Sequence, residues 1–199
     1  TYSQFEVPDA RRVYTTFEQP DLKSTFTLTV KAPKGWKVFS NAPTPTPEEE
    51  GEAWVYRFAT TEVMSTYITA IVAGPYEGTT ATLTSSDGRT IDLGVYARAS
   101  IVEHLDADEI IEITRQGFEF FEGAYGIAYP FTKYDQIFVP EYNAGAMENA
   151  GCVTFRDAYV FRTRPTEAQM EARANTILHE LAHMWFGDLV TMKWWNDLW

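Results

Sequence analysis

A pair of histidines in this chain has a spacing suited to binding one metal ion. The segment reads His179-Glu180-Leu181-Ala182-His183, and the chain has three histidines in all. On a helix, residues four apart lie on one face about one turn apart. Two neutral ring nitrogens can then bind one Zn²⁺ at about 2.0–2.1 Å each. We therefore interpret His179 and His183 as zinc ligands.

Glu180, next to the first histidine, is the candidate general base. Its carboxylate projects to one side of the pair and can reach a water molecule on the metal, whose pKa zinc lowers to about 7. Glu180 would take a proton from that water and pass it to the leaving amine. A chance His-Glu-x-x-His is expected in about one chain of this length in a few hundred. Its place on a predicted helix favours metal-assisted hydrolysis of an amide.

Two histidines leave the ligand set incomplete, because a catalytic zinc normally takes three protein ligands. Phe186 stands where metzincins carry glycine, which argues against that class. Asp188 follows the predicted helix end too closely to turn back easily onto the metal. We expect Asp197 to start a second helix, and His104 to be a surface or capping residue.

The segment Gly145-Ala146-Met147-Glu148-Asn149 is the second candidate for a functional role. At average composition such a string occurs in on the order of one in a million windows. An extended loop with glycine and alanine permits close approach of a peptide backbone, and Glu148 could pair with a protonated amine. A loop glutamate taken alone is usually only solvated. The segment therefore needs the histidine pair beside it to indicate a peptide-binding site.

The first 97 residues or so show strand signals. Residues 26–30 and 54–58 alternate apolar and polar side chains, and residues 67–72 form a more continuous apolar run. Asp87-Gly88 is a strong hairpin turn signal between expected strands at 79–84 and 90–96. Asn41 to Gly51 carries three prolines and three consecutive glutamates, so we expect a surface loop there.

The pattern becomes helical near residue 100. Asp106 or Asp108 could cap a helix that runs to about Tyr125 and is ended by Gly126 and Pro130. Its expected buried face comprises Ile110, Ile113, Phe118, Phe121 and Tyr125.

A second helix carries the histidine pair. Thr166 and Gln169 form a capping box, and the helix should run to about Trp185 and stop before Gly187. Short strands are expected at 136–139 and 152–155, with the loop 140–149 between them. We place a domain boundary between residues 99 and 100.

Composition narrows the class of protein. With 45% hydrophobic and 22% charged residues the chain is globular, and a net charge of −12 disfavours partners that carry phosphate, so we expect no nucleic acid. Cys152 cannot form an internal disulfide and is expected to be a core residue. No run of 18 apolar residues occurs, so we expect no membrane segment. We expect a cytoplasmic location, and further segments of the same protein before Thr1 and after Trp199.

Together the two motifs resemble the aminopeptidase N-like gluzincin family of zinc aminopeptidases, and the resemblance covers essentially the whole chain. Phe5 to Pro20 is similar to part of that family's N-terminal β-domain. Val139 to Gly151 is similar to its substrate-binding strand, and His179 to Trp199 to its zinc segment. The family often has Asp-Glu-Pro where this chain has Glu18-Gln19-Pro20, a difference confined to the β-domain.

The resemblance implies roles for the residues of both motifs. His179 and His183 bind zinc, Glu180 is the general base, and Glu148 holds the free α-amine of the substrate. The remaining implied substrate-binding residues are Gly145 and Ala146, which pair with the peptide backbone, Met147, which lines the first side-chain pocket, and Asn149. The family's third ligand, a glutamate, would fall about three residues beyond Trp199, and its transition-state tyrosine lies farther downstream.

The resemblance also implies an α+β fold. Residues 1–99 would be the later part of a saddle-like, antiparallel β-domain, and residues 100–199 the start of a thermolysin-like catalytic domain with its sheet edge and zinc helix. The favoured function is a zinc-dependent aminopeptidase that acts on peptides with a free N-terminus. One alternative is an inactive fragment or binding piece, because the third ligand is absent from the chain. A thermolysin-type endopeptidase is less favoured, because an amine-binding segment has no use at an internal bond.

Overall fold

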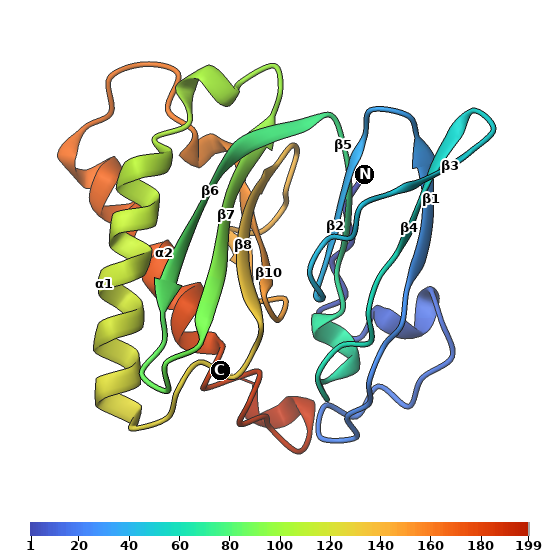
Figure 1. The fold of residues 1–199 in the computed structure, drawn as a ribbon. Helices are drawn as coiled ribbons and strands as arrows, with labels where there is room; N and C mark the ends of the chain where they lie inside the picture. The colour runs from blue at the N-terminus through green and yellow to red at the C-terminus, as the bar shows by residue number, and fades with distance from the viewer. Residues whose placement is uncertain (199) are drawn as a thin grey trace.

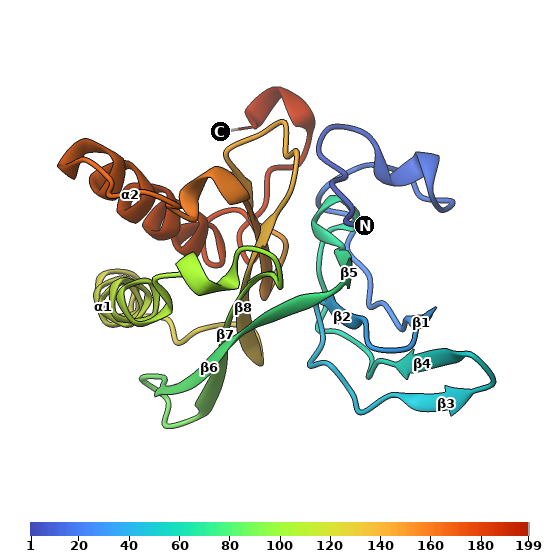
Figure 2. The same cartoon turned by 90° about the horizontal axis from the view of Figure 1, so that it is seen from above.

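A computed structural model describes residues 1–198. The chain forms three layers: two helices, a five-stranded sheet, and a set of smaller N-terminal sheets on the other side of it (Figure 1). Viewed from above, the helices again lie on one side of the large sheet and the N-terminal strands on the other (Figure 2). The predicted α+β class is confirmed. Within residues 1–198, no helix is both long and apolar enough to cross a membrane.

The N-terminal layer consists of two small antiparallel sheets. One has the order β1-β4-β3 and the other pairs β2 with β5. The strands are β1 (Thr29–Pro33), β2 (Lys37–Ser40), β3 (Glu48–Glu50), β4 (Ala53–Arg57) and β5 (Ile71–Gly74). Phe39 of β2 packs against the larger sheet, with its ring centroid 4.5 Å from that of Tyr96 and 6.1 Å from that of Tyr76.

Three expectations for this layer need correction. The strand expected at 67–72 starts at Ile71, because residues Thr66–Ile68 form a 3-10 turn (η2). The first strand starts at Thr29 rather than Phe26. The glutamate run is a strand and not a loop, because Glu48–Glu50 pairs with β4. All three glutamate side chains are nevertheless exposed, as expected for a solvated run of charges. A strand of this kind carries no hydrophobic signal in the sequence.

The larger sheet has the order β6-β7-β8-β10-β9. The antiparallel hairpin β6–β7 is confirmed, and Gly88 in its turn has a φ of +85°, which glycine adopts without strain. β7 then pairs with β8 and β8 with β10 in parallel, and β9 closes the sheet antiparallel to β10. The strands are β6 (Tyr76–Thr84), β7 (Thr90–Arg98), β8 (Lys133–Val139), β9 (Ala146–Met147) and β10 (Cys152–Arg156).

The larger sheet includes residues on both sides of the boundary that we placed between residues 99 and 100, and that boundary stays a prediction. Because β7 pairs with β8 over residues 92–97, the hairpin belongs to the larger sheet and not to the N-terminal layer. The sheets divide between β5 and β6, close to Pro75. Period-two alternation identifies a strand but says nothing about which distant strand it pairs with.

Helices α1 (Ala107–Tyr125) and α2 (Glu167–His183) pack on each other over one face of the sheet. A Cβ atom on Gly117 of α1 would lie 2.7 Å from Leu178 and from Leu181, so glycine permits the close approach of the helices. Tyr125, expected to be buried, is 42% exposed at the last turn of α1.

The cap of α1 also differs from expectation. Asp106 is the N-cap residue, but its side chain makes no capping hydrogen bond. Its carboxylate instead accepts from Arg173 of α2 at 2.8 Å, and Glu109 accepts from the same guanidinium at 2.9 Å. Arg173 is 1% exposed and therefore needs these partners. The contact clamps the start of α1 to the middle of α2.

The capping box of α2 is confirmed. The Gln169 backbone donates to the Thr166 hydroxyl at 3.3 Å, and the Thr166 backbone donates to the Gln169 side chain at 2.9 Å. The helix ends at His183, two residues before Trp185, where the chain tightens into a turn.

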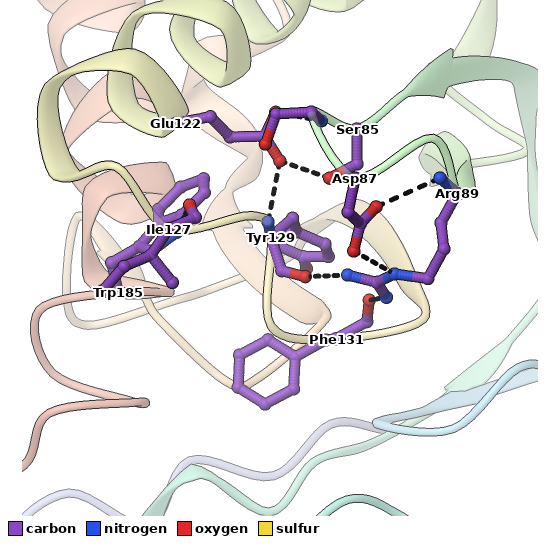
Figure 3. A network of polar contacts seen from close by, with 9 residues as sticks. Ser85, Asp87, Arg89, Glu122, Ile127, Tyr129, Phe131 and Trp185 are labelled. Atoms are coloured by element: carbon purple, nitrogen blue, oxygen red, sulfur yellow. Dashed lines mark hydrogen bonds and ion pairs between the residues drawn. The ribbon is translucent and has the colours of Figure 1, made fainter.

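A polar network joins the end of α1 to the β6–β7 hairpin and to the segment before β8 (Figure 3). Buried Glu122 accepts hydrogen bonds from the Ser85 hydroxyl and from the Tyr129 backbone, which joins α1 to the β6–β7 hairpin. Arg89 donates to the carbonyls of Tyr129 and Phe131. Close by, the Trp185 indole donates to the carbonyl of Ile127 at 2.9 Å. The residues just after the histidine pair are thus anchored to the segment that connects α1 with β8.

Candidate active site

The two histidines of α2 point their Nε2 atoms at each other. The Nε2 atoms are 3.0 Å apart, and the ring planes are inclined by 87° with centroids 4.5 Å apart. Two nitrogens bound to one tetrahedral ion at 2.0–2.1 Å would lie about 3.3 Å apart. The side chains therefore stand close to the arrangement in which both bind one ion.

His183 is held in a defined orientation by the chain that follows it. Its Nδ1 lies 3.1 Å from the carbonyl oxygen of Phe186. A carbonyl can only accept, so Nδ1 carries the hydrogen in this contact and Nε2 presents a lone pair. Burial lowers the pKa of His183, although the hydrogen bond with Phe186 opposes this shift. The pKa of His179 is also lowered, first by burial and second by the nearby His183. Both effects favour the neutral imidazole, the form that binds metals.

Two carboxylates converge on the same place. Ligand atoms of Glu148, Glu180 and His183 all lie within 4.8 Å of one another, and all three residues are buried. Burial, then Glu148 and Glu6, raises the pKa of Glu180 to about 9, and burial raises the pKa of Glu148. Within residues 1–198, Glu148 Oε1 and Glu180 Oε2 are buried without a hydrogen-bond partner. A divalent cation would compensate the charge of such buried carboxylates, so this set of donors fits a divalent ion.

The segment 145–149 reaches the histidine pair because β9 forms the edge of the sheet. Met147 and Ala146 of β9 pair with Thr154 and Phe155 of β10. The Gly145 carbonyl accepts from the Arg156 backbone at 3.0 Å. β9 is one of the two edge strands of this sheet, and an extended peptide can pair with such an edge.

The other members of the segment are more enclosed than the sequence indicates. Met147 is 1% exposed, and its sulfur accepts from the Gln4 side chain at 3.7 Å. Asn149 is fully buried, with its side-chain amide 3.3 Å from the Thr154 hydroxyl. Asn149 thus holds the turn between β9 and β10, while Glu148 is the residue that faces the histidine pair.

Sequence reasoning missed Glu6, Tyr67 and Tyr134. Burial, then Glu148, raises the pKa of Glu6 to about 7. Burial is the main cause that raises the phenol pKa of Tyr67, and Glu148 is the second. Burial also raises the phenol pKa of Tyr134, with Glu180 as the second cause. These residues lie far from both motifs in the sequence. The one available signal was the resemblance over residues 5–20, which includes Glu6 but gives it no role.

Asp188 lies beside the site but outside the group formed by Glu148, Glu180 and His183. It is 1% exposed, and neither carboxylate oxygen has a hydrogen-bond partner among the described residues. Burial and then Glu148 raise the pKa of Asp188 well above its usual range, whereas Lys23 lowers it. Asp188 therefore adds a further buried acid near Glu148 and Glu180.

Two other predicted features lie away from the site. The helix expected to start at Asp197 is a 3-10 turn (η5, Trp195–Asp197) that ends there. His104 is partly exposed, 3.8 Å from Glu103, and is a surface histidine as expected. Trp199, the last residue of the zinc segment, lies outside the described residues.

Comparisons with known proteins agree with the two-part organisation. Residues 1–68 match the Peptidase M1 N-terminal domain, and residues 109–199 match the Peptidase family M1 domain. The chain is 62% identical over 198 residues to aminopeptidase N of Streptomyces lividans, covering 100% of this chain and 22% of that protein.

More distant relatives show the same coverage. Tricorn protease-interacting factor F2 of Thermoplasma acidophilum is 39% identical over 198 residues, with 99% of this chain and 24% of that protein covered. Aminopeptidase N of Homo sapiens is 37% identical over 205 residues, with 99% and 21% covered. The chain spans about a quarter or less of the length of these relatives. With both domain types matched in sequence order, the chain belongs to peptidase family M1.

Proposed function

We propose that this chain carries the metal-binding and amine-binding parts of a zinc aminopeptidase, which releases N-terminal residues from peptides with a free N-terminus. Membership of a peptidase family implies peptide substrates and a metal cofactor. The observation that carries the proposal is the meeting of the His179–His183 pair with buried Glu148 and Glu180. It joins a metal-binding face of α2 to the edge strand on which a peptide would lie.

His179 and His183 would hold the zinc through their Nε2 atoms. When bound, zinc supplies a Lewis acid and lowers the pKa of a water molecule. By the resemblance, a third ligand would follow about three residues after Trp199. The Phe186 carbonyl keeps the Nδ1 hydrogen of His183 in place, so the other ring nitrogen stays available as a ligand.

Glu180 would act as the general base. It would take a proton from the attacking water and later deliver it to the nitrogen of the leaving amine. Burial beside Glu148 and Glu6 raises the affinity of its carboxylate for a proton, which suits a group that must hold and return one.

Glu148 and Glu6 would bind the protonated N-terminal amine of the substrate. Burial raises the pKa of both carboxylates, and Glu148 raises that of Glu6 further, so an ammonium group bound beside them would stabilise their charged forms. The backbone of Gly145 and Ala146 would hold the peptide beside β9. A site that requires a free amine selects the first peptide bond, so the enzyme would be an exopeptidase.

The test compares this chain with a form extended past Trp199. Zinc content and hydrolysis of an aminoacyl chromogenic substrate are measured for both, with an N-acetylated peptide as the second substrate. We expect the extended form to cleave only the substrate with the free amine, and Glu180→Gln and Glu148→Ala to reduce that cleavage at least about 100-fold. Unchanged kinetics for Glu148→Ala would remove the amine-binding role. Cleavage of the acetylated peptide would instead favour an endopeptidase.

A second candidate function is a binding or structural piece without activity of its own. The observation that favours it is the ligand set, since two histidines are the only zinc-binding nitrogens in the described residues near the site. Absence of activity and of zinc in both the chain and its extended form would support this reading. A cytoplasmic location, inferred from one cysteine and a net charge of −12, is likewise a proposal that cell fractionation tests.

A further inference from the structure

The loop that follows α2 controls the orientation of His183. Phe186 in this loop offers its carbonyl to His183 Nδ1 at 3.1 Å. The loop folds back on itself, since the Asp188 backbone donates to the His183 carbonyl at 2.9 Å and the Gly187 backbone to the Val190 carbonyl at 2.8 Å. Gly187 has a φ of +148°, which a residue with a side chain rarely adopts. A displacement of this loop would therefore move the carbonyl that orients the imidazole.

A lysine from the N-terminal layer holds this loop from outside. Lys23 Nζ donates to the carbonyl of Asp188 at 2.7 Å and to that of Leu189 at 2.9 Å. Lys23 lies in the part matched to the N-terminal domain, and the loop lies in the part matched to the catalytic domain. The C-terminal segment and the N-terminal loops lie side by side in both views (Figures 1 and 2).

A second contact fixes the same two segments a few residues farther on. The Trp195 indole donates to the carbonyl of Glu18 at 2.8 Å, and its ring lies edge-on to Tyr67 with centroids 5.2 Å apart. Glu18 has a φ of +54°, a conformation that costs free energy outside glycine. Its buried side chain accepts a hydrogen bond from the Arg11 backbone, which helps to hold this conformation.

We propose that Lys23 is a positioning residue for the metal site: through the carbonyls of Asp188 and Leu189 it fixes the loop whose Phe186 carbonyl orients His183. The inference rests on the proposed function, because it takes His183 as a metal ligand. Partners that orient a ligand histidine typically contribute 10–100-fold to metal affinity. Lys23 acts one step farther out, so its loss should lie near the lower end of that range.

The test uses Lys23→Met, which keeps the apolar stem but removes the donors, and Lys23→Arg, which restores donors and charge. Lys34→Met is the matched control, because Lys34 is an exposed lysine of the same layer that pairs with Glu49 at 3.0 Å. Calorimetric titration gives the zinc affinity of each chain. Nitrogen-15 spectra of the metal-free chains report which ring nitrogen of His183 carries the hydrogen.

We expect Lys23→Met to weaken zinc binding about 10-fold and to mix the two ring tautomers of His183. Lys23→Arg should remain within about threefold of the original chain, and Lys34→Met should leave both measurements unchanged. Zinc affinity within twofold and an unchanged tautomer in Lys23→Met would overturn the proposal, whatever happens to the unfolding midpoint. An equal loss in Lys34→Met would overturn it as well.

Two further outcomes keep the test decisive. If Lys23→Met fails to fold, Lys23→Gln replaces it, because its shorter, uncharged side chain loses the paired contacts to the Asp188 and Leu189 carbonyls, and the same loss of zinc affinity is expected. Unchanged affinity in that variant would overturn the proposal. Failure of the form extended past Trp199 to bind zinc would contradict the proposed function, whereas the tautomer of metal-free His183 would still decide whether Lys23 positions it.

Discussion

For the ion pairs of Arg173 with Asp106 and Glu109, we predict that removing the two carboxylates destabilises the fold more than removing the arginine. The guanidinium is 1% exposed, whereas the side chains of Asp106 and Glu109 that pair with it are 47% and 39% exposed. Removing the arginine leaves carboxylates that water can solvate. Removing both carboxylates leaves a buried cation with the Tyr159 carbonyl as its remaining hydrogen-bond acceptor and the ring of Phe161 beside it.

The expected magnitudes follow from this difference in exposure. The double variant Asp106→Ala, Glu109→Ala leaves a buried charge uncompensated, which costs about 3–5 kcal/mol. Arg173→Met loses the same two charge-assisted bonds but strands no buried charge, so we expect a loss of about 1–3 kcal/mol. Methionine also fills part of the space of the arginine stem.

Urea unfolding of the metal-free chain measures both values. With a slope of about 2 kcal/mol per molar urea, the double variant should unfold at a midpoint about 2 M lower, and Arg173→Met at a midpoint about 0.5–1.5 M lower. Glu112→Gln serves as the control, because Glu112 is an exposed glutamate of α1 in a 4.0 Å ion pair. A double variant no less stable than Arg173→Met would refute the reasoning that burial decides the cost.

Three further predictions concern burial and metal linkage. Burial, opposed by Lys133, raises the pKa of Cys152 from 9.0 to about 12. As pH rises, the unfolded chain therefore loses the thiol proton before the folded chain does. The free energy of unfolding should then fall by about 1.4 kcal/mol between pH 7 and pH 10, relative to the Cys152→Ala variant. Denaturant titrations at each pH measure this difference. Glu122→Leu leaves buried donors of Ser85 and Tyr129 unpaired and should lower the free energy of unfolding by about 2–4 kcal/mol, whereas a change below 1 kcal/mol would contradict the network. Zinc at 100 times its dissociation constant should stabilise the chain by about 2.7 kcal/mol in thermal melts, and a chelator should reverse this, while no shift would mean that zinc does not bind the folded state.

The local features of the site could be predicted from the sequence. The capping box at Thr166 and Gln169 fixes the start of α2, and the four-residue spacing then places His179 and His183 on one face. Both depend only on neighbours within one helical turn. The turn at Gly88 was predictable for the same reason.

Features that depend on distant residues could not be predicted from the same patterns. Asp106 looks like a helix cap by position, but a buried arginine on another helix takes its carboxylate. The pKa of Glu6 is raised by burial and by Glu148, which the fold brings near it from another layer. The pairing of β7 with β8 is likewise non-local, so the alternation within β7 does not reveal that the β6–β7 hairpin joins the larger sheet. Hydrophobic periodicity reports the face of an element but not its partner.

The most direct test of the account is the zinc environment of this chain. X-ray absorption of the zinc-loaded chain should show two imidazole nitrogens at about 2.0–2.1 Å from the metal. His179→Ala and His183→Ala should each remove one of these nitrogens and weaken zinc binding, whereas His104→Ala, at a surface histidine, should change neither. A zinc ion that keeps the same nitrogen ligands and affinity in both active-site variants would contradict the claim that the His179–His183 pair holds the metal.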